Sequence, residues 1–219
     1  MVSFEQVKSN PDIAEYIRRA DQSLSALGYT EHSFAHVGKA VSAVEYILST
    51  YGFTDHQIEI AKIAAYMHDI GNLVNRVDHS QSGAMMAFRI LDNMGMDATD
   101  IATIVTAIGN HDEGTGVPVN EIAAALIIAD KSDVRRSRVR NNDISTFDIH
   151  DRVNYSVTES KLEVDSDKRE IILSLNIDTN YSSVMDYFEI FMNRMIMCRK
   201  AADRLGMRFR LIINGQFLL

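Results

Sequence analysis

Apolar side chains recur every three or four residues through most of the first 134 positions, the spacing of helices that bury one face. Asn10-Pro11 and the Thr54–Gln57 pair are start signals for two of these helices. Gly71 is expected to end the helix that begins at Thr54. The segment 118–134 contains the most apolar helix, and a helix apolar on most sides belongs in the centre of a bundle. The pattern predicts helices over 11–27, 33–52, 54–69, 79–94, 97–109 and within 118–134.

A different pattern follows these helices. Residues 141–151 are polar and predict a loop, whereas later stretches alternate apolar and polar positions as strands do. The alternation predicts strands at 161–165, 170–177 and 209–213, with a helix between Ser183 and Gly206.

These patterns predict a mainly α fold. A helical bundle over about 11–140 is expected to carry a C-terminal extension over about 151–219, in which a small antiparallel β-sheet and one helix pack on the bundle. No clear linker separates the two parts, so we expect residues 1–219 to form a single domain.

Composition is that of a soluble globular protein, with 46% apolar and 24% charged residues among 219. The longest strongly apolar run, 122–129, is too short to cross a bilayer, and the N-terminus lacks the order of a signal peptide. The single cysteine, Cys198, cannot form an internal disulfide. We therefore expect a cytoplasmic protein without a membrane partner.

The net charge of −8 argues against binding to duplex nucleic acid, which requires Lys and Arg against phosphates. One basic cluster interrupts this acidic chain. It favours either a binding site for charged groups of a nucleotide or, as a structural alternative, capping of a helix C-terminus. The cluster consists of Lys131, Arg135, Arg136, Arg138 and Arg140.

Histidines and aspartates at the ends of predicted helices form the main chemical signal. His68-Asp69 stands in an apolar helix, where an ionised carboxylate requires a compensating partner such as a cation. Helix ends on one side of a bundle can converge on one pocket. A lone histidine is usually not a ligand, so His32, His56 and His150 are set aside. The candidates are His36, His68, Asp69, His79, His111 and Asp130.

The order of these residues resembles the HD superfamily of metal-dependent phosphohydrolases. Ala-Tyr-Met-His68-Asp69-Ile-Gly is similar to the signature turn of that family, and Ile-Ile-Ala-Asp130-Lys131 to its closing aspartate. His79-Ser-Gln-Ser-Gly and Asn110-His111-Asp112-Glu113 resemble segments of its two-metal members. The resemblance covers roughly residues 30–140. It implies a helical core and hydrolysis of a phosphate ester or anhydride.

The resemblance also implies the ligand roles. His36, His68, Asp69 and Asp130 would hold a first metal, and Asp69 would bridge to a second held by His79 and His111. Imidazole and carboxylate together suit a divalent transition metal (Mn, Fe, Co, Zn or Ni) better than Mg, with one or two ions per chain.

Two departures from the family pattern limit the resemblance. Asn110 stands where many two-metal members have a histidine, so the second site is expected to be weaker or empty. Asn72 stands where the cyclic-dinucleotide phosphodiesterase branch commonly has lysine, which disfavours that branch.

We therefore predict a phosphohydrolase acting on a nucleotide or another small phosphorylated metabolite. Asp69, Lys131 and Glu113 are the candidate catalytic residues, and Lys131, Arg135 and Arg138 the candidate substrate-binding residues. The alternatives are a di-iron oxygenase of the same helical type and a non-catalytic nucleotide-binding regulatory module. The Met-rich helix near residues 185–197 is consistent with core packing or a homodimer contact.

Overall fold

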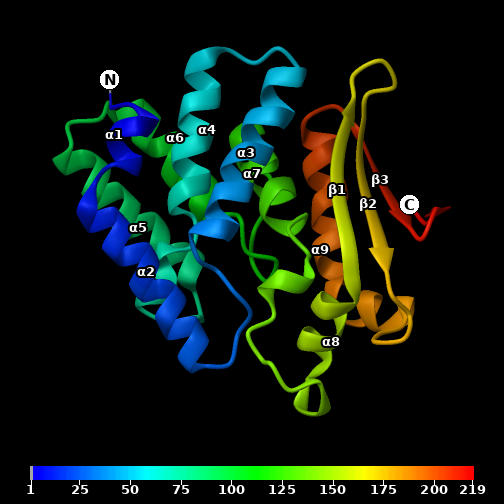
Figure 1. The fold of residues 1–219 in the computed structure, drawn as a ribbon. Helices are drawn as coiled ribbons and strands as arrows, with labels where there is room; N and C mark the ends of the chain where they lie inside the picture. Colours follow the sequence, from blue (N-terminus) through cyan, green and yellow to red (C-terminus); the bar gives the residue numbers. More distant parts are fainter. Residues whose placement is uncertain (1) are drawn as a thin grey trace.

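The computed structural model describes residues 2–219, and its N-terminal part is a bundle of helices (Figure 1). Every helix predicted over residues 11–134 is present, preceded by one short helix that the pattern did not predict. Asn10 and the Thr54–Gln57 capping box begin their helices as expected. The elements are α1 (Phe4–Lys8), α2 (Pro11–Ala26), α3 (Phe34–Thr50), α4 (Asp55–Met67), the 3-10 turn η1 (Ile70–Leu73), α5 (His79–Asn93), α6 (Ala98–Gly109) and α7 (Glu121–Lys131).

Helix α7 occupies the centre of the bundle, as its apolar character predicts. Every side chain from Ile122 to Ala129 is buried. The helix packs against α3, α4 and α6 on the bundle side and against α9 (Val184–Arg204) of the C-terminal part. The buried apolar residues of both parts form one continuous cluster, and the packing of α7 on α9 is the main contact between them.

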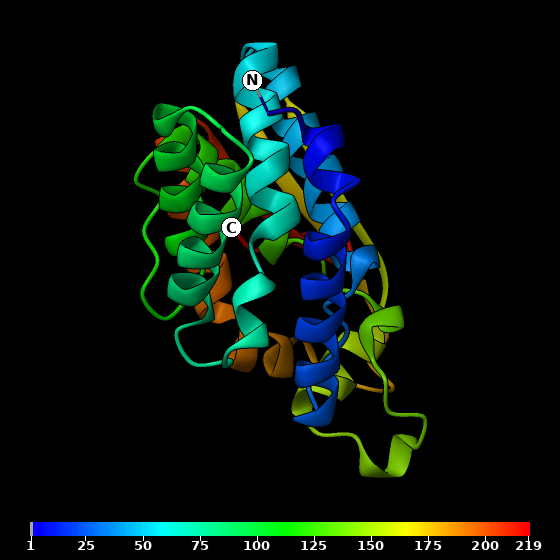
Figure 2. The same ribbon diagram turned by 90° about the vertical axis from the view of Figure 1, so that its left-hand side faces the viewer.

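The C-terminal part forms a four-stranded sheet beside α9, on the opposite side of the molecule from α2 and α5 (Figure 1). In Figure 2, seen from the helical side, the sheet lies largely behind the helices. The remaining elements are η2 (Arg136–Arg138), η3 (Ile144–Thr146), α8 (Ile149–Ser156), β1 (Val157–Asp165), β2 (Glu170–Ile177), β3 (Arg208–Ile213) and β4 (Gln216–Phe217).

The sheet corrects one prediction. Its order is β1-β2-β3-β4, and β2 pairs with β3 in parallel, whereas the other two pairs are antiparallel. The expected antiparallel sheet is therefore wrong at this pair. Helix α9 supplies the physical reason, because it runs back along the sheet as a crossover and returns the chain to the starting end of β2.

Two boundaries also differ from prediction. Helix α8 begins at Ile149, inside the segment predicted as a loop, where Asp148 caps it by accepting from the Asp151 amide. Strand β1 begins at Val157, earlier than expected. Within residues 2–219, no helix is both long and apolar enough to cross a membrane.

Gly71 has a different role from the predicted one. Helix α4 ends at Met67, before this glycine, and the chain continues into the 3-10 turn η1. A Cβ atom at Gly71 would lie 1.9 Å from the carbonyl oxygen of His79 and 2.4 Å from the amide nitrogen of Gly83. The missing side chain is therefore needed for the close approach of η1 to α5.

Candidate metal centre

Five elements deliver the six candidate ligands to one place. His36 lies in the first turn of α3, and His68 and Asp69 follow the last residue of α4. His79 is the first residue of α5, His111 follows α6, and Asp130 lies near the end of α7. His36, His68 and His111 are each at most 1% exposed, and Asp69 is 7% exposed. Two groups, His36/His68/Asp130 and His68/Asp69/His111, present ligand atoms within 4.8 Å of one another.

The first set consists of two imidazoles and two carboxylates. The Nε2 atom of His36 lies 3.3 Å from that of His68 and 3.3 Å from Asp130 Oδ1. Asp69 Oδ2 lies 3.3 Å from His68 Nε2 and 3.7 Å from His36 Nε2. Atoms bound at about 2.1 Å to one ion lie roughly 3.0–3.4 Å apart. The four atoms are therefore spaced as the ligands of one ion would be, slightly expanded.

The other oxygen of Asp69 faces a second pair of histidines. Asp69 Oδ1 lies 3.5 Å from Nε2 of His79 and 3.8 Å from Nε2 of His111, and these two nitrogens are 3.2 Å apart. Asn72 donates to the same oxygen at 2.9 Å and so fixes the carboxylate plane. Asp69 thus lies between two sets of nitrogens, as a carboxylate that bridges two cations does.

Each of the four imidazoles is oriented by its other nitrogen. In every case Nδ1 lies within hydrogen-bonding distance of an oxygen, which favours the tautomer whose unprotonated Nε2 faces the centre. The partners of Nδ1 are Asp133 Oδ2 for His36 (2.9 Å), the Ala65 carbonyl for His68 (2.8 Å), the Arg76 carbonyl for His79 (3.1 Å) and the Ile108 carbonyl for His111 (2.6 Å).

The electrostatics of the site require positive charge. Burial raises the pKa of Asp69 and Asp130, but the histidines around both, and Lys131 beside Asp130, outweigh it and hold each pKa well below its usual range. Burial lowers the pKa of His68, yet the same two carboxylates raise it to about 10. A divalent cation would provide the compensation that a proton on His68 provides otherwise, so the donor set fits a divalent metal.

Lys131 and Glu113 lie beside the first set. Lys131 Nζ lies 2.7 Å from Asp130 and 3.0 Å from Glu113, whose other oxygen accepts from Arg194 Nε at 3.1 Å. Burial raises the pKa of Glu113, but Lys131 and Arg194 lower it to about 2. Burial lowers the pKa of Lys131, and Asp130 and Glu113 more than reverse this effect. Both side chains are therefore charged at neutral pH.

A small cavity of about 10 Å³, room for roughly one water molecule, adjoins the two sets. All of its lining side chains are ionisable, and three of them were missed by sequence reasoning. Arg76 and Arg194 lie outside the basic cluster and outside any motif, and His32 was set aside as a stray histidine. The lining residues are His32, Asp69, Arg76, His79, His111, Asp130, Lys131, Arg138 and Arg194.

The basic cluster divides between different places. Arg138 lines the cavity and is 4% exposed, with its guanidinium donating to the carbonyls of Glu31 and Asp133. Arg136 donates to the Tyr155 carbonyl, and Arg140 pairs with Asp21. Helix α7 ends at Lys131, so none of these arginines extends it.

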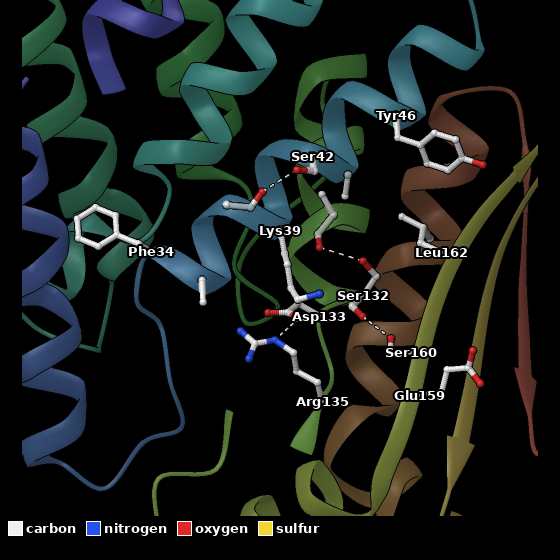
Figure 3. A pocket seen from close by; sticks show the side chains of 14 residues that line it. Phe34, Lys39, Ser42, Tyr46, Ser132, Asp133, Arg135, Glu159, Ser160 and Leu162 are labelled. Atoms are coloured by element: carbon white, nitrogen blue, oxygen red, sulfur yellow. Dashed lines mark hydrogen bonds and ion pairs between the residues drawn. The ribbon is translucent and has the colours of Figure 1, made fainter. Parts of the chain in front are cut away.

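Arg135 does not reach the cavity. Its guanidinium pairs with Glu31 at 2.5 Å and Asp133 at 2.9 Å, and it lines a separate open cleft between α3, the end of α7 and β1 (Figure 3). This cleft holds about 850 Å³ but none of the candidate metal ligands. Asp133 connects the two places, because its other oxygen accepts from His36 Nδ1.

Asn110 takes no part in the centre. It follows the last residue of α6, and its amide donates to the Thr106 carbonyl one turn earlier. Asp112 approaches the second set, with Oδ1 4.0 Å from His79 Nε2. The occupancy of the second set, which Asn110 was expected to reduce, stays a prediction.

Comparisons with known proteins give distant relatives. No family model matches the chain. An uncharacterized protein of Methanocaldococcus jannaschii is 24% identical in an alignment of 198 positions that covers 78% of this chain and 76% of that protein. A crystal structure of a predicted HD superfamily hydrolase from an uncultured Thermotogales bacterium aligns with a TM-score of 0.44 and 26% identity, over 57% of this chain and 67% of that one.

Proposed function

We propose that this protein is a metal-dependent phosphohydrolase of the HD type. One observation carries the proposal: the two oxygens of the buried Asp69 face two separate sets of Nε2 atoms, each oriented by a hydrogen bond on its far side. Four imidazoles and two carboxylates at this spacing suit divalent transition metals. His36, His68, Asp69 and Asp130 would hold one ion, and Asp69, His79 and His111 a second.

Divalent ions in such a site activate water as a nucleophile and neutralise charge on a phosphoryl group. The residues of the chain would do the rest. Lys131, which keeps its proton at neutral pH, would contact phosphoryl oxygens beside Asp130. Glu113, with a pKa of about 2, is a weak base, so we assign it to holding Lys131 and Arg194 in place and not to proton abstraction.

The substrate is proposed to be a nucleotide or another small phosphorylated metabolite. The cationic lining of the cavity supports a phosphorylated substrate over the neutral polyol that an oxygenase would take. A single domain, a cytoplasmic location and a homodimer remain predictions that accompany this proposal.

The proposal is tested by elemental analysis and a substrate screen. Protein purified with Mn²⁺, Co²⁺, Fe²⁺, Zn²⁺ or Mg²⁺ is assayed for release of phosphate from nucleotides and simple phosphoesters. We expect bound metal and metal-dependent turnover. Asp69→Ala should remove the bound metal and lower turnover by at least about 10³-fold, because metal stabilisation of the reacting phosphate contributes several kcal/mol.

Lys39→Gln is the matched control. Lys39 lines the cleft of Figure 3, away from the candidate ligands, so this variant should keep metal and turnover. Full metal content in Asp69→Ala would contradict the proposed centre. Metal without hydrolysis of any phosphoester, combined with O₂-dependent oxidation of a polyol, would favour the oxygenase.

A further inference from the structure

Four cations line the cavity of the metal centre, and two of them have few partners within the protein. Lys131 is engaged by Asp130 and Glu113. Arg138 is buried and engaged by two backbone carbonyls. Arg76 and Arg194 are the other two, and they come from opposite parts of the chain: the turn before α5, and helix α9 of the C-terminal extension.

Arg194 has free hydrogen-bond donors. Its Nε donates to Glu113, and its guanidinium lies over the Phe191 ring at 4.4 Å. Within residues 2–219, no acceptor satisfies its two terminal nitrogens. The side chain is 20% exposed, so the fork is held by its base and open at its tip. A phosphoryl group has the oxygen spacing that fits such a fork.

Arg76 is less constrained still. In the described part of the chain it forms no ion pair with a carboxylate. One terminal nitrogen lies 3.3 Å from both Asn72 Oδ1 and His79 Nε2, at the limit of a hydrogen bond. Its guanidinium carbon lies 5.6 Å from the centre of the Tyr29 ring. This half-buried cation therefore lies beside the second histidine pair with little to neutralise it.

The lining of the cavity limits what can bind. Its walls consist of ionisable side chains and offer no apolar surface, so the organic part of a substrate would gain nothing by entering. Both arginines are half-buried and in contact with solvent, whereas Lys131 and Arg138 are buried. Only a small, strongly charged group gains by entering.

We propose that Arg76 and Arg194 bind the terminal phosphate of the substrate from two sides, which makes the enzyme selective for phosphomonoesters over phosphodiesters. A monoester dianion offers three terminal oxygens to the two forks and one bond to an organic group that stays outside. A diester offers only two and would place a second organic group against charged walls. This inference rests on the proposed function, and it gives the C-terminal extension a role in the site.

The test measures binding and turnover in the metal-loaded, full-length protein. Inorganic phosphate is titrated calorimetrically into wild type, Arg76→Gln, Arg194→Gln and Arg194→Lys, and bound metal is measured in each. Each Gln variant should bind phosphate roughly ten- to a hundredfold more weakly, because a hydrogen bond to a charged group is lost. Metal content should be unchanged. Arg194→Lys should recover only part of the affinity, because Lys lacks the fork.

Arg199→Gln is the control on the same helix, since Arg199 is exposed and lies outside the cavity lining. It should bind phosphate as wild type does. Arg76→Gln guards against a folding effect, because Arg76 supports no carboxylate, whereas Arg194 also holds Glu113. In the wild type, a phosphomonoester should be cleaved faster than the matching methyl diester, and both Gln substitutions should reduce that ratio.

Two outcomes separate this inference from the proposed function. In the first outcome, the wild type binds metal and cleaves phosphoesters, but phosphate affinity is unchanged in both Gln variants or diesters are preferred. This outcome would overturn the proposed role of Arg76 and Arg194 and leave the proposed function intact. Wild-type protein that binds neither metal nor phosphate would overturn both.

Discussion

The metal-centre cavity and the cleft of Figure 3 lie on either side of Asp133 and differ in almost every property. The cleft is large, open and lined by a mixture of serines, apolar side chains and a few charges. The cavity is small, and each imidazole of the centre is fixed on its far side. Chemistry depends on preorganised groups more than on space. The smaller of the two is therefore the better candidate for the active site.

The largest expected effect is on the free energy of unfolding and its dependence on pH, through Glu113 beside the cavity. The folded pKa of Glu113, about 2, is below its ordinary 4.5. The contribution of the ionised Glu113 side chain to the free energy of unfolding is therefore fully present above pH 4.5 and is lost as the pH falls from 4.5 towards 2. The shift corresponds to roughly 3 kcal/mol at most, because Glu113 is 26% exposed and solvent screens part of it. Glu113→Gln should lower the free energy of unfolding by up to that amount at pH 7.

Urea denaturation of the metal-free protein between pH 2 and 7 measures this effect. The difference between wild type and Glu113→Gln should shrink as the pH falls through the window. Glu159→Gln, an exposed position in the cleft, is the matched control and should stay close to wild type throughout. A constant difference for Glu113→Gln at all pH values would contradict the ion-pair explanation.

Asp133 tests the boundary between the two regions. Asp133→Ala removes the acceptor that orients His36, and loss of such an outer hydrogen bond typically weakens metal binding roughly 10- to 100-fold. Competition with a metal-binding dye measures the affinity. Ser160→Ala changes the cleft alone, where its hydroxyl donates to the Ser132 carbonyl, and should leave metal affinity intact. Equal losses in both variants would show that the regions are not separable.

The smallest expected effect is a gain in stability at the cleft wall. Gly38 lies inside α3, is exposed, and has nothing within 4 Å of where its Cβ would be. Gly38→Ala should stabilise the protein by roughly 0.5–1 kcal/mol, because alanine is the better helix former. Thermal unfolding checks this. A lower melting temperature in Gly38→Ala would contradict this expectation. It would mean that the α3 position needs a glycine, as the tightly packed Gly71 does at the metal centre.

The ligand candidates could be found from the sequence because each stands at a helix end marked by local signals. The two arginines at the cavity, Arg76 and Arg194, could not be found from the sequence. Arg194 reaches the cavity only because α9 packs on α7, a contact between distant segments that no local pattern encodes. The sequence also could not predict which of Arg135 and Arg138 lines the cavity, because the 3-10 turn η2 determines which of the two side chains points inward.

The bundle was predictable for the same reason: caps and helical periodicity are local. Strand pairing is not. Residues 170–177 and 209–213 alternate in the same way whether they pair parallel or antiparallel, and only the course of α9 between them decides. Gly71 shows a further limit of prediction from sequence. A glycine is found both where a helix stops and where two backbones approach closely, so the sequence alone does not tell which of the two applies.

The crossover helix α9 also has a consequence for biosynthesis. A chain made from its N-terminus presents all six His and Asp ligand candidates by residue 130, well before Arg194 emerges, and β3 follows later still. All six proposed metal ligands are therefore synthesised before Arg194, one of the two arginines proposed to bind the phosphate.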